Sequence, residues 1–139
     1  DNTEVKKYPD RELNHYIEFN SDQLDQTAKQ YGVSREDMLK QYDLDDEDEF
    51  NAVNEDSSKL RVKQEMLIQY IADKENLSYT DKEKESLIKS FEAQGYDADA
   101  IEQQTGRTLE DYVHIELLYE KVLDFLLDNA NITGAPTTE

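Results

Sequence analysis

The sequence contains no cysteine and no tryptophan, and it has only two histidines, two prolines and four glycines. Without cysteine the chain can form neither a disulfide nor a thiolate site. So few turn-forming residues argue against an all-β fold with many tight turns. No glycine-rich loop is present, and no apolar run reaches the roughly 18 residues of a membrane-spanning helix. These absences favour a protein that acts through its surface rather than through a reaction centre.

Acidic residues greatly outnumber basic ones. The 139 residues include 34 Asp and Glu but only 15 Lys and Arg, which gives a formal net charge of −19. Such a charge repels phosphate backbones and anionic membrane surfaces, so we expect neither nucleic-acid binding nor membrane insertion. Hydrophobic residues make up 36% of the chain and charged residues 35%, which is less apolar and more charged than an ordinary domain. We therefore expect a thin, extended core.

Apolar residues recur at helical spacing through most of the chain. Residues that start and stop helices divide the chain into five or six helical segments. The strongest start is the capping box Thr80-Asp-Lys-Glu83, and Gly32 is a natural helix stop because glycine accepts a positive φ. The expected helices begin after Pro9, Ser34, Asp45, Thr80, Asp97 and Thr108, and end near Gly32, Tyr42, Asn76, Gly95, Gly106 and Ala130.

The two longest expected helices, 46–76 and 108–130, carry the most apolar surface, so we expect them to pack against each other. Val53, Leu60 and Leu67 lie seven residues apart and predict a coiled-coil-like seam on the first of these helices. The predicted fold class is all-α: an elongated multi-helix module with two long packed helices and a helical arm. Residues 1–133 would form this helical domain and residues 134–139 a flexible tail.

No pattern in the chain predicts catalysis, a cofactor or a metal. The acidic stretch 43–49 lacks the glycine and the glutamate that a calcium loop needs at its sixth and twelfth positions, so we interpret it as the solvated start of a helix. His15 and His114 are far apart, and zinc would require further nitrogen or sulfur ligands. No Gly-x-Ser-x-Gly elbow is present. We therefore expect a chain that is not itself an enzyme.

Nine tyrosines and four phenylalanines are the most informative side chains. Most fall on helical stripes and are expected to pack between helices. Several lie in the polar N-terminal half, where burial is hardest to achieve. Exposed aromatic and methionine side chains on helices suit adaptable binding of apolar peptides. The candidate peptide-binding residues are Tyr16, Phe19, Met38, Tyr42, Phe50 and Met66.

Several segments together resemble the C-terminal region of bacterial trigger factor. They occur in the order found in that family and cover nearly the whole chain. The most specific of them is the last helix, with its Val-Leu-Asp-Phe-Leu-Leu sequence. The segments are Val5–Pro9, Gln30–Gly32, Arg61–Leu67, Ile71–Glu75, Tyr79–Glu83 and Tyr119–Leu127.

This resemblance implies a fold and a function. The family combines a ribosome-binding domain, an FKBP-like prolyl isomerase domain and a helical C-terminal domain. The helical domain is related in fold to the peptide-binding part of SurA, and its arms cradle unfolded clients. This chain resembles the helical domain alone. It lacks the Gly-Phe-Arg ribosome-binding signature and anything like the isomerase domain, so neither activity is assigned to these residues.

The expected function is that of an ATP-independent chaperone module, which holds unfolded or nascent polypeptides through many weak apolar contacts. The acidic charge would add a preference for basic clients, weakened by salt. The alternative is a structural or assembly module that binds one fixed protein partner. The sequence does not decide whether the protein forms a homodimer. It also leaves two compartments open: the bacterial cytoplasm, or the cell surface for an extracytoplasmic lipoprotein. Because the chain begins at Asp1 rather than at methionine, we expect a fragment or a processed chain.

Overall fold

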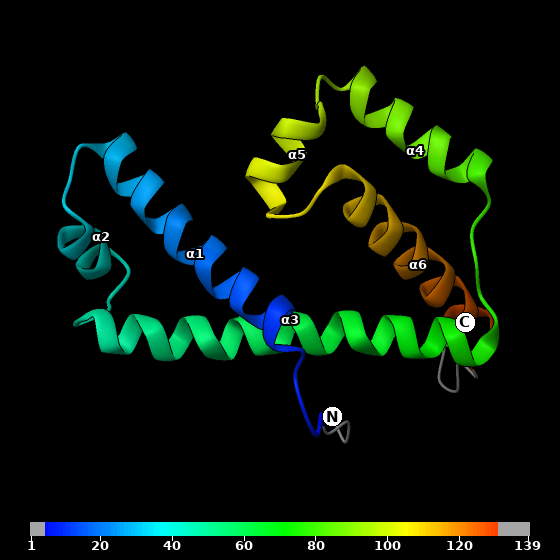
Figure 1. The fold of residues 1–139 in the computed structure, drawn as a ribbon, viewed down its shortest axis with the longest axis horizontal. Coiled ribbons are helices and arrows are strands. Elements are labelled where there is room, and N and C mark those ends of the chain that lie inside the picture. Colours follow the sequence, from blue (N-terminus) through cyan, green and yellow to red (C-terminus); the bar gives the residue numbers. More distant parts are fainter. Residues whose placement is uncertain (1–4, 131–139) are drawn as a thin grey trace, which may run out of the picture. The chain divides into compact units, whose positions relative to one another are not determined.

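The computed structural model describes residues 5–130, and every regular element in that range is an α-helix. The all-α class predicted from the sequence is therefore confirmed. No helix within these residues is long and apolar enough to cross a membrane. The helices are α1 (Asp10–Tyr31), α2 (Arg35–Gln41), α3 (Glu47–Glu75), α4 (Asp81–Ala93), α5 (Ala98–Thr105) and α6 (Leu109–Asp128) (Figure 1).

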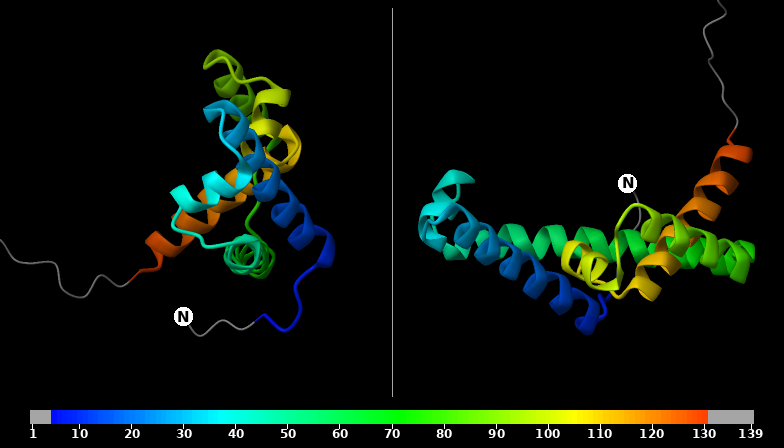
Figure 2. Two further views of the ribbon diagram at one scale, coloured as in Figure 1. Left: turned by 90° about the vertical axis from the view of Figure 1, so that its left-hand side faces the viewer. Right: turned by 90° about the horizontal axis from the view of Figure 1, so that it is seen from above.

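The chain divides into two compact units, which we call the N-terminal unit (Asp1–Met66) and the C-terminal unit (Leu67–Glu139). Helix α3 is continuous, so its longer first part belongs to the N-terminal unit and its end to the C-terminal unit (Figure 2). The predicted tail, 134–139, lies outside the described residues.

Local signals set the ends of α1. Pro9 is extended, with φ −64° and ψ 119°, and its carbonyl accepts the first helical hydrogen bond from the Leu13 amide at 3.0 Å. Asp10 and Glu12 lie in the first turn, where negative charge favours the helix dipole. Gly32 ends the helix in the left-handed region, with φ 68°, a conformation that costs glycine little. Both ends agree with the sequence prediction.

The core of the N-terminal unit joins three helices. Leu24 and Ala28 of α1 pack with Met38 and Leu39 of α2 and with Phe50 of α3. Partly buried residues of the connecting segments, Val33 and Leu44, cover this cluster. Burial of these side chains fixes the short helix α2 against the ends of its neighbours.

The predicted seam on α3 is wrong. Val53 and Leu60 are 53% and 54% exposed, whereas Asn54 and Ser58 are 3% and 1% exposed. The buried face of α3 in the N-terminal unit thus carries small polar residues, followed by Val62 one turn later. Hydrogen bonds to α1 make this burial possible, because a buried polar group is tolerated when it has a partner.

The core of the C-terminal unit is apolar. Ala72 near the end of α3 packs with Leu118 and Val122 of α6, so the predicted packing of the two long helices is confirmed within this unit. Helix α5 packs beside the beginning of α6 (Figure 2) and buries Ile101. The partly buried residues around the cluster are Ile68, Ile71, Leu77 and Tyr79.

Helix α4 has no fully buried residue, but Leu87, Ile88 and Phe91 are partly buried, and the centre of the Phe91 ring lies 5.7 Å from that of Tyr112 of α6. The predicted capping box is present: the Glu83 amide donates to the Thr80 hydroxyl at 3.2 Å, and the Thr80 amide donates to the Glu83 carboxylate at 2.7 Å. Lys121 of α6 also donates to Glu83, and Lys84 pairs with Glu110 at 2.6 Å. The Lys121 hydrogen bond, with those from Thr80, lowers the pKa of Glu83 to about 2.

Candidate functional site

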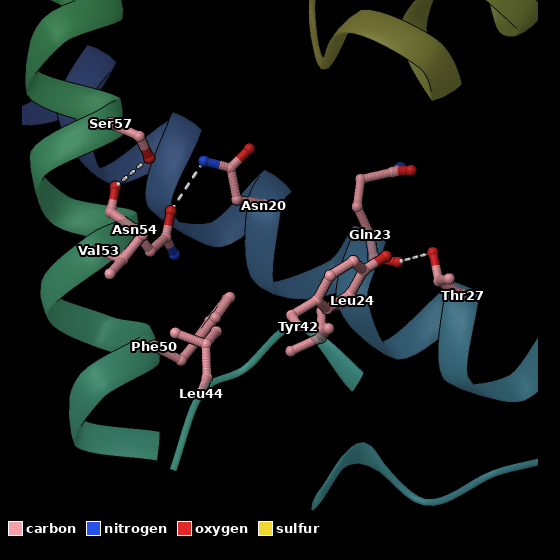
Figure 3. Close-up of a pocket in the computed structure, with 10 residues that line it drawn as sticks. All are labelled: Asn20, Gln23, Leu24, Thr27, Tyr42, Leu44, Phe50, Val53, Asn54 and Ser57. Carbon is pink, nitrogen blue, oxygen red and sulfur yellow. Dashed lines mark hydrogen bonds between the residues drawn. The ribbon is translucent and has the colours of Figure 1, made fainter. Parts of the chain in front are cut away.

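A pocket of about 480 Å³ opens on the N-terminal unit, between α1, α3 and the segment that links α2 to α3 (Figure 3). Helix α1 contributes residues 20, 23, 24 and 27, and α3 contributes residues 50, 53, 54 and 57. Both sets follow the i, i+3, i+4, i+7 spacing of a single helix face. Two helices therefore present one face each to the same space, and Tyr42 and Leu44 of the linking segment complete the lining.

The apolar part of the pocket has a buried floor and an exposed margin. Leu24 and Phe50 are 7% and 9% exposed and belong to the core of the unit. Tyr42 and Val53 also line the pocket but are 58% and 53% exposed. An apolar side chain from another molecule could therefore contact hydrocarbon on several sides without displacing the core.

A polar network forms the other side of the pocket. The Asn54 amide donates to the Ile17 carbonyl at 2.9 Å, and its oxygen accepts from the Asn20 amide at 2.8 Å (Figure 3). The Ser58 hydroxyl donates to the same Asn54 oxygen at 3.3 Å. These bonds satisfy the buried amide and set the separation of α1 and α3, so the pocket has a defined width.

Arg35, the first residue of α2, ties the helices around the pocket together. Its Nη1 donates to Asp25 of α1 at 2.8 Å, and its Nε donates to Glu47 of α3 at 2.7 Å. Its guanidinium carbon lies 5.0 Å from the centre of the Phe50 ring. The hydrogen bond with Glu47 is the main cause that raises the pKa of Arg35 above its usual range, so the guanidinium stays charged.

The structure brings together two of the six predicted site residues, Tyr42 and Phe50, in this pocket. Met38 is 2% exposed and packs in the same core cluster as Phe50. Phe19 is half-buried and Met66 is 36% exposed, and neither lines the pocket. A direct role in peptide binding requires exposed side chains at these positions, but Met38 and Phe50 are buried, at 2% and 9% exposed.

Tyr16 is also buried, at 1% exposed, so it does not meet this requirement either. Its hydroxyl donates to Glu65 of α3 at 2.5 Å, and the Arg61 guanidinium carbon lies 4.2 Å from the centre of its ring. The Tyr16 ring therefore belongs to the contact between α1 and α3, where Glu65 accepts from its hydroxyl and Arg61 lies over its face.

Sequence reasoning missed most of the pocket lining. The sequence predicts Val53 to lie in a helix-packing seam, and Asn20 and Asn54 carry no apolar signal. The helical spacing of residues 20, 23, 24 and 27 was visible in the sequence. This spacing indicates a pocket only when a second helix face lies opposite, and the pairing of two helix faces depends on tertiary structure.

The acidic stretch before α3 serves as a helix start, as its interpretation from sequence stated. The Glu49 amide donates to Asp46 at 3.0 Å, and the Asp45 amide donates to Glu49 at 2.7 Å. Across residues 5–130, no group of three or more His, Asp and Glu side chains is arranged to hold a metal ion.

Comparisons with known proteins agree on one family. The family model described as bacterial trigger factor protein C-terminus matches residues 1–128. A curated relative, the trigger factor of Bacillus licheniformis, is 31% identical over 108 residues, which cover 77% of this chain and 25% of that protein. The chain thus spans a quarter of the length of this relative. No solved structure matches the chain significantly.

Proposed function

This chain belongs to the bacterial trigger factor C-terminal family, and on that premise we propose that it holds unfolded or nascent polypeptide segments, without ATP and without catalysis. Membership of the family supports a chaperone-type role. The finer part of the proposal is the place of contact, the pocket of the N-terminal unit. We expect no prolyl isomerase activity from these residues in a proline-peptide assay.

The observation that carries this proposal is the pocket itself, with its buried apolar floor and its exposed margin of Tyr42 and Val53. An aromatic client side chain buries roughly 200 Å², which at ~25 cal/mol per Å² gives about 5 kcal/mol of gross stabilisation. Loss of translational and rotational freedom offsets most of that gain. A single pocket therefore binds weakly and reversibly, as holding a chain that must later fold requires.

The polar side of the pocket suits a partner without a fixed sequence. Amide and hydroxyl groups of Asn20, Gln23 and Ser57 line it beside the apolar residues. Such groups can exchange hydrogen bonds with the backbone of an extended client. Because the backbone is the same in every sequence, these contacts would add affinity without selecting one client.

The neighbouring charge favours basic clients. A second hollow of the same unit is lined by Glu36 and by the acidic residues 45–48. Lysine or arginine beside an apolar client residue would be attracted to these carboxylates. Since they are solvent-exposed, the attraction falls as salt is added. We expect binding of a basic apolar peptide to weaken from low to physiological salt.

The test uses substitutions at exposed positions, where the fold is least affected. We expect Tyr42→Ser with Val53→Ser to weaken binding of a fluorescent apolar peptide by about tenfold and to reduce suppression of aggregation of an unrelated unfolded protein. Tyr31→Ser with Leu60→Ser is the matched control, because these residues are also exposed and lie outside the pocket. If both double variants bind the peptide equally well and keep their helicity, the pocket is not the place where clients bind.

One observation favours the alternative, a module that binds a fixed partner. Four apolar side chains of α6 are between 42% and 61% exposed: Tyr119, Leu123, Leu126 and Leu127. Their spacing places them on one helix face, and a contiguous exposed apolar row marks an interaction surface in many proteins. A fixed partner predicts saturable binding with a defined ratio that Leu123→Ser abolishes. A chaperone surface predicts binding to many unrelated unfolded chains.

A further inference from the structure

Arg35 makes more contacts than any simple surface ion pair requires. Besides Asp25 and Glu47, it donates to the Ser21 carbonyl from Nη1 and to the Ser21 hydroxyl from Nη2, both at 3.2 Å. Its Nη2 also donates to the second oxygen of Glu47 at 3.1 Å. One guanidinium thus joins α1 to the first turn of α3, and it does so from the start of α2.

The chemistry of these bonds requires arginine. Guanidinium carries five N–H donors in a rigid, planar fork, which can meet a carboxylate with two parallel bonds. A lysine ammonium has three donors at a single point. Lysine would keep the charge but could not reach Glu47, Asp25 and Ser21 at the same time.

The contact with Phe50 connects Arg35 to the pocket. The guanidinium lies 5.0 Å from the centre of the ring, within the range of a cation–π contact. Phe50 lines the pocket, whereas Arg35 lines the neighbouring acidic hollow and does not line the pocket. Arg35 therefore touches the wall of the pocket from outside it.

We propose that Arg35 is a positioning residue for client binding: it holds α1, the start of α3 and the Phe50 ring in the arrangement that keeps the pocket open to an apolar side chain. This role rests on the proposed function of the pocket. Arg35 acts through Phe50 and through the spacing of the helices, not through contact with the client.

The experiment compares Arg35→Lys with Arg61→Lys in the full 139-residue chain. Arg61 is a matched control, because its guanidinium also lies over an aromatic ring of the same unit, that of Tyr16, and it lies outside the pocket. Affinity is measured with a fluorescent apolar peptide. We expect Arg35→Lys to weaken binding by about tenfold and Arg61→Lys to change it by less than about twofold.

A spectroscopic readout separates positioning from general destabilisation. The chain has only four phenylalanines, so ¹³C-labelled Phe rings can be resolved by NMR. In the unsubstituted chain, the peptide should shift the Phe50 resonance. Arg35→Lys should move that resonance before any peptide is added and should reduce its response to the peptide. Glu47→Gln, which keeps Arg35 but weakens one of its partners, should give intermediate values while the helicity stays unchanged.

The outcomes distinguish the two proposals. If the unsubstituted chain binds the peptide and shifts Phe50, but Arg35→Lys behaves identically, the role of Arg35 is overturned and the pocket stands. If Arg61→Lys weakens binding as much as Arg35→Lys does, a specific role for Arg35 is overturned as well. If the unsubstituted chain neither binds the peptide nor shifts Phe50, the proposed function fails, and the role of Arg35 with it.

Discussion

The two units join their helices by different chemistry. In the N-terminal unit, α1 meets α3 through the bonded side chains of Asn20, Asn54 and Ser58, and through the hydrogen bond from Tyr16 to Glu65. In the C-terminal unit, the end of α3 meets α6 through an apolar cluster that contains Leu118 and Val122. The first contact buries polar groups beside the apolar cluster of Leu24, Ala28 and Phe50, whereas the cluster at the second contact is hydrocarbon alone.

This difference has consequences for stability and for uniqueness. A buried hydrogen bond contributes only about 1 kcal/mol net, yet an unpaired buried amide costs more than that. The polar contact therefore tolerates few alternative registers while adding little free energy. Apolar burial adds more free energy and is less directional. We infer that the contact between Asn20 and Asn54 depends on specific partners, whereas the contact between α3 and α6 depends on the amount of hydrocarbon buried.

The largest expected effect is loss of apolar contact in the C-terminal unit. Leu118 is 4% exposed, so Leu118→Ala should lower the free energy of unfolding of this unit by about 3 kcal/mol, through lost burial and a cavity. Urea unfolding followed by hydrogen exchange of α6 amides measures it. Leu123→Ala on the same helix is the control, since that side chain is 42% exposed. Equal effects of the two changes would contradict an apolar core at Leu118.

The next effect tests the polar contact. Asn54→Ala removes the donor to the Ile17 carbonyl and the nearer acceptor of the Asn20 amide, which keeps only its 3.3 Å bond to the Ser58 hydroxyl. This loss should cost about 2 kcal/mol in the N-terminal unit. Exchange should rise at α1 amides and stay unchanged in α6. Asn51→Ala, at an exposed position of the same helix, should have almost no effect. If Asn54→Ala also leaves α1 exchange unchanged, the network does not stabilise this unit.

Sequence alone predicted the helix ends well, because their causes are local. Gly32 has the left-handed conformation that its position after the apolar stripe indicated. Thr80 and Glu83 form the reciprocal bonds that their spacing predicted. Each of these features depends on atoms within a few residues, so no tertiary information was needed.

The inner face of α3 could not be predicted in the same way. Asn54 is buried because Asn20, 34 residues earlier, pairs with it. A hydrophobic pattern assigns such residues to solvent and assigns Val53 and Leu60 to the core, the reverse of what the structure shows. Partners that are distant in sequence decide which polar residues are inside.

The candidate site was predicted in part for a similar reason. Aromatic side chains in a polar region directed attention to Tyr42 and Phe50, and both line the pocket. Tyr16 belonged to the same cluster in the sequence, but Glu65 gives its hydroxyl a partner inside the unit. Whether an aromatic ring faces a client or a neighbouring helix depends on such partners.

A smaller effect is expected at the capping box of α4. No residue of this helix is fully buried, so its cap and the ion pairs at its edge add to the partial burial of Leu87, Ile88 and Phe91. Thr80→Ala should destabilise α4 by about 1 kcal/mol, because the Glu83 amide loses its acceptor. Faster hydrogen exchange confined to the first turns of α4 would show it, with the exposed Ser78→Ala as the control. Unchanged exchange would mean that the cap does not stabilise this helix measurably.

The smallest effect is electrostatic and depends on pH. The bond from Lys121, with those from Thr80, lowers the pKa of Glu83 from 4.5 to about 2. The folded state therefore favours the ionised Glu83 carboxylate. Its contribution to the free energy of unfolding is complete above about pH 4.5 and is lost as pH falls toward 2. NMR titration of the side-chain carboxyl should therefore place Glu83 below the other glutamates.

Glu83→Gln should remove that part of the pH dependence of α4 stability, whereas Glu85→Gln, at an exposed position of the same helix, should keep it. The effect is small because Glu83 is 39% exposed and water screens the pair. An ordinary pKa at Glu83 would mean that Lys121 does not hold α4 against α6 in solution. The partial burial of Leu87, Ile88 and Phe91, with the contact between the Phe91 and Tyr112 rings, would then hold this edge of the C-terminal unit.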